Sequence, residues 1–206
     1  MLNKIIAFLI LLTLNFIGIV YGNDKNIYFD RCYCYTLTKP ESWYFAKIED
    51  YIGKPQFVLK DKVKEKQLNE STDLPSLIII RDKKPHDGYN PKFTLHLLKW
   101  KFNSSITHES ILQSFILASQ KYLDEFEIIE DIKKINISSY DAFSIKYKYL
   151  LINTEEKIKV NANMIVINKK HIVYIIQTLR NSEDKENTEK EFESIIKSIK
   201  FDICTD

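Results

Sequence analysis

The chain has 206 residues and a formal net charge of +2, with acidic and basic residues interspersed along its length. This length suits one domain with its own hydrophobic core. The near-neutral balance argues against nucleic acid or an anionic membrane surface as a partner, since both require a concentrated basic surface.

The first 22 residues have the organisation of a secretory signal peptide. One cation, Lys4, precedes an apolar run from Ile5 to Val20, and Gly22 supplies a small residue for cleavage. We expect a signal peptide at 1–22, a single domain at 23–206, and an exported protein that is periplasmic or extracellular. A retained membrane anchor is the alternative, although the run is interrupted and shorter than the roughly 20 residues that span a membrane.

Three cysteines, Cys32, Cys34 and Cys204, lie in the part expected to be exported, where disulfides persist. On one extended strand Cys32 and Cys34 would share a face at roughly 6–7 Å, too far apart for a mutual bond without a bend. We therefore expect one of them to pair with Cys204, which would clamp the two ends of the domain. The remaining thiol is either unbonded or paired with another chain.

The domain is expected to open with a strand over Asn26 to Thr38, which Pro40 ends because proline removes a backbone donor. Residues 41–53 follow as a short irregular or helical segment. Trp43 lies directly behind the chain break, and core packing across a sheet end explains it better than contact with a ligand.

Two buried strands come next, and they predict an antiparallel hairpin with a long connection. The run "PSLIIIRDK" (75–83) is apolar and bounded by turn formers, and "KFTLHLLKWKF" (92–102) is apolar on both faces in its middle. A shorter strand is expected at 56–62.

The second half of the chain alternates between helix and strand signals. Thr107 is a plausible N-cap for a helix with an apolar stripe that runs to Leu123. Four antiparallel strands are then expected, because apolar and polar residues alternate strictly, and a final helix follows at 185–200. The predicted strands are 125–137, 141–151, 156–168 and 171–180.

Three pieces of this sequence resemble the PsbP-like fold, which is shared by photosystem PsbP proteins, Ran-binding Mog-one proteins and many short exported bacterial proteins. The resemblance covers about 33–201. It implies an α+β fold, with a central, mostly antiparallel sheet flanked by helices in an α/β/α sandwich, and it implies accessory and binding roles. The pieces are "YTLTKPESWYF" (35–45), "INISSYDAFSIKYKYL" (135–150) and "EFESIIKSIKF" (191–201).

The sequence contains no Gly-x-Ser-x-Gly elbow, no phosphate-binding glycine loop and no His-Glu-x-x-His motif. His86 with Asp87 is interpreted as a solvated turn, His96 as a half-buried strand residue, and His108 and His171 as surface positions. We predict no catalytic residue, no cofactor site and no metal site.

The resulting hypothesis is an exported, non-enzymatic binding or accessory domain whose partner is a protein or a small apolar ligand. One alternative is a secreted effector or envelope-assembly factor that docks a larger partner. Another is a hydrolase or metal-dependent enzyme that uses His86, His96 or His108 with nearby acids.

Overall fold

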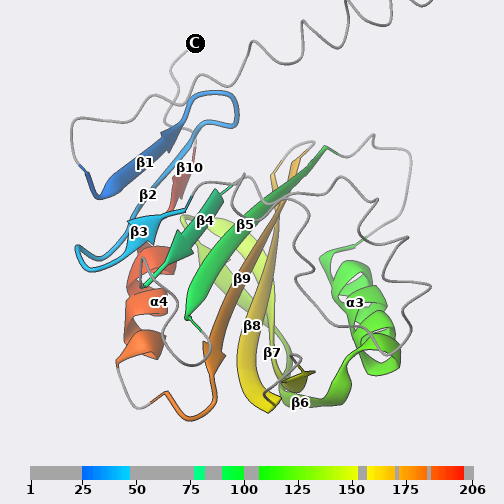
Figure 1. Cartoon of the computed structure of the whole chain (residues 1–206). Helices are drawn as coiled ribbons and strands as arrows, with labels where there is room; N and C mark the ends of the chain where they lie inside the picture. The colour runs from blue at the N-terminus through cyan, green and yellow to red at the C-terminus, as the bar shows by residue number, and fades with distance from the viewer. Residues whose placement is uncertain are drawn as a thin grey trace, which may run out of the picture.

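Figure 1 shows the computed structural model of the chain, in which a seven-stranded antiparallel sheet lies at the centre. Helix α3 covers one face of this sheet. Helix α4 and a small three-stranded sheet cover the other face. This arrangement confirms the expected α+β fold. The structure describes residues 25–46, 77–81, 90–99, 107–152, 157–169, 172–184 and 187–201.

The strand order in the large sheet is β3-β4-β5-β9-β8-β7-β6, and in the small sheet it is β1-β2-β10. Among the described residues, no helix is long and apolar enough to cross a membrane. The elements are β1 (Ile27–Asp30), β2 (Tyr35–Thr38), β3 (Tyr44–Phe45), β4 (Leu77–Ile80), β5 (Lys92–Lys99), α3 (His108–Tyr122), β6 (Asp124–Ile137), β7 (Tyr140–Ile152), β8 (Lys157–Lys169), β9 (Ile172–Asn181), α4 (Thr188–Ser198) and β10 (Lys200–Phe201).

Each face of the large sheet carries its own hydrophobic core. On one face, Leu112 of α3 packs against side chains that include Ile145, Tyr147 and Met164. The core on the other face joins the sheet to α4 and to the small sheet, and it includes Trp43 and Phe192. Because both faces are covered, the middle strands bury side chains that point in both directions.

The four long strands pair antiparallel, as the alternating pattern predicts. The register of β7, β8 and β9 places Lys146 beside Asn163, and Asn163 beside Thr178. Strand β6 forms an outer edge of the sheet, and its pairing with β7 shifts register between Asp124 and Lys133.

The expected single strand over Asn26 to Thr38 is wrong, because the chain reverses in its middle. Strands β1 and β2 form a hairpin around the turn 31–34. The carboxylate of Asp30 accepts a hydrogen bond from the Tyr33 N–H at 3.0 Å, and Cys34 adopts a left-handed φ of 53°. Cys32 and Cys34 therefore lie in a turn and do not share the face of one strand.

The predicted chain break at Pro40 is confirmed, since β2 ends at Thr38. The Trp43 N–H donates to the Pro40 carbonyl at 3.0 Å, which turns the chain. The indole is then fully buried, as expected for a core residue. The neighbouring residues Tyr44 and Phe45 form strand β3 against β4, and so are not the irregular or helical piece that the sequence suggests.

Helix α3 begins where the sequence predicts. The Thr107 hydroxyl accepts a hydrogen bond from the Ser110 N–H at 3.1 Å, and the Ser110 hydroxyl accepts one from the Thr107 N–H at 3.0 Å. This reciprocal capping box satisfies two backbone donors that the helix leaves unpaired. The last helix is shorter than expected, because Lys200 and Phe201 leave it to form β10.

Several predictions fall outside the described residues. These are the signal peptide at 1–22, the short strand at 56–62, the His86–Asp87 pair, His171 and Cys204.

Candidate functional site

The sheet face that carries α4 changes from apolar to polar along its strands. At one end of this face, Ile165 of β8 and Ile176 of β9 are paired and belong to the hydrophobic core. The row of Lys146, Asn163 and Thr178 follows at the other end, and the row of Lys148, Asn161 and Arg180 lies beyond it. We call these six residues the polar half of the sheet. Strict alternation puts them all on the side of α4.

A chain of five charges crosses the polar half from β6 to β9. Lys133 pairs with Glu130, and Lys146 Nζ lies 3.0 Å from Glu130 Oε1 and 3.2 Å from Glu189 Oε1. The second carboxylate oxygen of Glu189, Oε2, is 3.2 Å from Nε of Arg180. The chain alternates in sign and both ends are cations, so its net charge is +1.

These contacts change the ionisation of the groups that make them. Hydrogen bonds from Lys133 and then Lys146 hold the pKa of Glu130 below its usual value. Burial acts to lower the pKa of Lys146, but its hydrogen bonds to Glu130 and Glu189 outweigh that effect and raise the pKa. The Glu130 carboxylate and the Lys146 ammonium group therefore stay charged near neutral pH.

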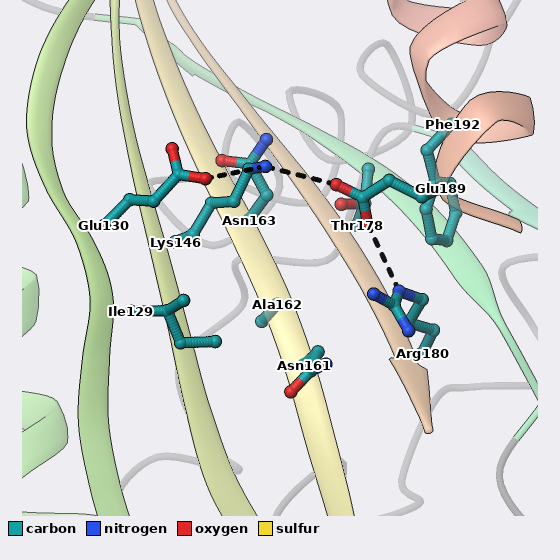
Figure 2. Close-up of a pocket in the computed structure, with 10 residues that line it drawn as sticks. All are labelled: Ile129, Glu130, Lys146, Asn161, Ala162, Asn163, Thr178, Arg180, Glu189 and Phe192. Atoms are coloured by element: carbon teal, nitrogen blue, oxygen red, sulfur yellow. Dashed lines mark hydrogen bonds and ion pairs between the residues drawn. The ribbon is translucent and has the colours of Figure 1, made fainter. Parts of the chain in front are cut away.

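A pocket of about 160 Å³ opens in the polar half, between the strands and the first turn of α4. Figure 2 shows Lys146 between Glu130 and Glu189, and Arg180 on the far side of Glu189. Asn161 and Ala162 lie on the neighbouring strand β8, where Asn161 is the direct cross-strand partner of Arg180. The lining residues are Ile129, Glu130, Lys146, Asn161, Ala162, Asn163, Thr178, Arg180, Glu189 and Phe192.

Neighbouring contacts hold the lining in place. The buried Ser144 hydroxyl donates to Oδ1 of Asn163 at 2.8 Å, which orients that amide. At the start of α4, Nη1 of Arg81 lies 2.8 Å from the Thr188 hydroxyl and 3.2 Å from Oδ2 of Asp184. Because Thr188 precedes Glu189, this contact ties the first turn of α4 to the end of β4.

A second cavity lies at the same end of these strands, just beyond the row of Lys148, Asn161 and Arg180. It holds about 550 Å³ and is more open to solvent. Its lining is Glu125, Leu150, Lys157, Ile158, Lys159, Asn181 and Glu183.

The histidines that the sequence singles out lie apart from the polar half. His96 on β5 is half-buried, as expected. His108, expected at the surface, is half-buried, and its ring stacks on Phe143 with centroids 5.3 Å apart and planes at 19°. Its Nε2 atom is buried without a hydrogen-bond partner among the described residues. Burial lowers the pKa of His108, although Asp141 opposes the shift.

The sequence predicted no site residue in the polar half. The signal was present in part, because the alternation in β7 places Lys146 and Lys148 opposite the apolar side chains. The contribution of Arg180 and Glu189 depends on strand register and on the position of α4, which one strand's pattern does not contain. In the part of the chain that the structure describes, no group of three or more His, Cys, Asp or Glu residues is arranged to hold a metal ion.

Comparison with known proteins gives a family and a fold. Residues 60–201 match the family described as PsbP-like protein. No curated protein sequence matches the chain. The solution structure of cyanobacterial PsbP (CyanoP) from Synechocystis is 14% identical with a TM-score of 0.51, and the match covers 90% of this chain and 98% of that one.

Two further structures are similar at lower scores. LpqN of Mycobacterium tuberculosis, described as involved in cell envelope biogenesis, is 13% identical with a TM-score of 0.49, covering 89% of this chain and 88% of that one. The Ran-binding protein Mog1p of Saccharomyces cerevisiae is 8% identical with a TM-score of 0.48, covering 87% of this chain and 96% of that one.

Proposed function

Since the chain belongs to the PsbP-like protein family, we propose that it is an exported, non-enzymatic accessory domain that binds a protein partner through the polar half of its sheet. The accessory and binding roles that the family resemblance implies support this proposal. The pattern of a signal peptide at 1–22 supports export to the periplasm or the outside of the cell.

The observation that carries the proposal is the polar half itself. Its cations Lys146 and Arg180 pair with carboxylates of β6 and α4, and together these groups line a partly exposed pocket beside α4. Paired charges at a partly exposed surface add little to folding stability, whereas they give specificity to an interface. Pockets that bind small ligands are mostly apolar and roughly 300–1,000 Å³ in volume. The pocket in the polar half is smaller, at about 160 Å³, and has charged residues in its lining. A protein partner therefore suits this surface better than a small apolar ligand.

We also propose that Cys34 forms a disulfide with Cys204. Cys32 is exposed, whereas Cys34 is partly buried beside the start of β2, which favours Cys34 as the bonded residue. Phe201 of β10 pairs with Tyr35, the residue after Cys34. Cys204 follows Phe201 by three residues, a span of roughly 10 Å in extended chain, so its sulfur is within reach of the hairpin.

Affinity capture of the exported protein from its own cells tests the binding proposal. Lys148→Glu reverses a charge in the polar half, where Nζ of Lys148 lies 2.9 Å from Glu127 Oε2. Lys134→Glu is the matched control, because Lys134 lies outside the polar half and makes a similar exposed pair with Asp141 at 2.7 Å. We expect a partner that the wild type and Lys134→Glu retain and that Lys148→Glu loses by fivefold or more.

Two results would contradict the proposal. One is equal capture by both charge-reversal variants. The other is catalytic turnover by the purified protein that a single polar substitution abolishes without loss of the fold. The intact mass of the exported protein tests the export part, since we expect a chain that begins at Asn23.

A further inference from the structure

The five-charge chain in the polar half ends at an arginine that still has donors to offer. Glu189 contacts Arg180 through Nε, and among the described residues this is the only ion pair that Arg180 makes. Both terminal nitrogens of the guanidinium therefore keep their N–H groups. A planar fork of this kind matches a carboxylate, which it binds with two parallel hydrogen bonds.

The charges around Arg180 favour the binding of one additional anionic group. The charge chain from Lys133 to Arg180 has three cations and two carboxylates, so one further carboxylate would neutralise it. The Arg180 side chain is 21% exposed, so a contact made there is screened by solvent less than a contact at the surface.

The size and composition of the pocket narrow the occupant further. A cavity of about 150 Å³ accommodates a group the size of benzene. The pocket here, of about 160 Å³, therefore holds one amino-acid side chain and not a larger molecule. Ile129 and Phe192 offer apolar contacts to the stem of that side chain, while Asn161 and Thr178 offer polar contacts near its end.

We propose that this pocket receives an acidic side chain, glutamate or aspartate, of the partner protein, with Arg180 as the anchor of its carboxylate. This inference rests on the proposed function, because it assumes a protein partner at the polar half. It adds the chemistry by which that partner is recognised.

Nuclear magnetic resonance of the purified exported protein provides the test. The probes are N-acetyl-glutamate methylamide, its glutamine counterpart and inorganic phosphate. We expect the glutamate probe to shift the backbone signals of Asn161 and Arg180 with a dissociation constant in the low millimolar range, and the glutamine probe to bind at least tenfold more weakly. Equal binding of the two probes would overturn the inference, and so would tighter binding of phosphate, which would indicate an adventitious anion only.

Variants separate the anchor from its surroundings. Arg180→Gln should abolish binding of the glutamate probe, and Arg180→Lys should weaken it about fivefold, because lysine keeps the charge and loses the fork. Lys134→Gln is the control and should bind as the wild type does. If Arg180→Gln fails to fold, Asn161→Asp serves in its place. This substitution puts a negative charge in the pocket beside Arg180, so it should also abolish binding of the glutamate probe. Wild-type affinity in a folded Arg180→Gln or Asn161→Asp variant would overturn the inference.

The two proposals fail in different ways. If cells yield a partner that Lys148→Glu loses and Arg180→Gln retains, the protein-binding function stands and the acidic anchor is wrong. If the glutamate probe binds through Arg180 but capture does not depend on the polar half, the anchor chemistry stands and the proposed interface is wrong.

Discussion

Trp43 follows the turn at Pro40, and its packing stabilises the fold. Its indole is fully buried, and its ring packs edge-on against Phe192 of α4 with centroids 5.3 Å apart. The indole therefore joins the start of the domain to its last helix. Its Nε1 atom has no hydrogen-bond partner among the described residues, so the ring contributes through packing alone.

We predict that Trp43→Ala lowers the free energy of unfolding by about 3–5 kcal/mol, the usual cost of a large cavity in a core. Trp43→Phe should cost less, because it keeps an aromatic contact to Phe192 and removes the unpartnered N–H. Urea unfolding measures both values. A loss below 1 kcal/mol for Trp43→Ala would show that the indole is not packed as described.

His108 predicts a dependence of stability on pH. Its pKa is lowered in the folded protein by burial against Phe143, with Asp141 opposing the shift. As the pH falls below about 6.5, the unfolded chain therefore takes up a proton before the folded chain does, and the free energy of unfolding decreases. Lys134, which pairs with Asp141, moderates the effect of that carboxylate.

The measurement is the free energy of unfolding between pH 7.5 and pH 5.5, for the wild type and for His108→Phe. The substitution keeps the stacked ring and removes the titration, so we expect a smaller decrease in the variant. Glu130 also has a lowered pKa, but its contribution is lost only below about 4.5, outside this window. Parallel curves for the two proteins would contradict the prediction.

At the scale of elements, α4 depends on one buried contact at its first residue. The Thr188 hydroxyl is fully buried, accepts a hydrogen bond from Arg81 and donates one to Oδ2 of Asp184 at 2.7 Å. Asn187, the N-cap of α4, makes no side-chain capping bond. The network around Thr188 therefore fixes the helix start in place of a cap.

We predict that Thr188→Val destabilises the protein by about 1–3 kcal/mol, because it preserves shape but leaves Arg81 and Asp184 short of a buried partner. Glu193→Ala is the control on the same helix. It breaks only the exposed pair with Lys197, so its effect should stay within about 0.5 kcal/mol. Hydrogen exchange of the α4 amides locates the loss, and similar exchange rates in both variants would contradict the assignment.

The elements that sequence alone predicts well are those with strong periodicity or a side-chain cap. The helix at Thr107 and the four long strands belong to this group, because local pattern and tertiary burial agree there. The hairpin at 27–38 was missed because its turn contains neither glycine nor proline. The turn depends on the Asp30 carboxylate and on a left-handed Cys34, a conformation that sequence rarely signals for a non-glycine residue.

The candidate site was predicted only in part, for a related reason. Pattern alone places Lys146 and Lys148 on a polar face. It does not reveal that Arg180, 34 positions after Lys146, lies on the neighbouring row of that face, because this follows from the register of three strands. The pairing of Glu189 with Lys146 and Arg180 depends in addition on how α4 packs against the sheet.

At the scale of the whole molecule, the proposed disulfide would join the opening hairpin to the C-terminal end. In the chain-entropy model so long a loop contributes roughly 4–5 kcal/mol. We predict that the denatured mass of the protein isolated from its own cells rises by about 2 Da on reduction, in the wild type and in Cys32→Ser. In Cys34→Ser this rise should disappear, and a rise that persists would show that Cys32 is the bonded residue.

Strand β6 has a consequence for how these molecules behave when they are crowded together. Its outer backbone is the place where a second copy could add a strand and start a fibre. The register shifts make this edge of the sheet irregular. The edge also carries charged residues, among them Glu127, Glu130 and Lys133. Irregular, charged borders of this kind oppose strand addition between copies. This edge of the sheet is therefore protected against the addition of a strand from a second copy.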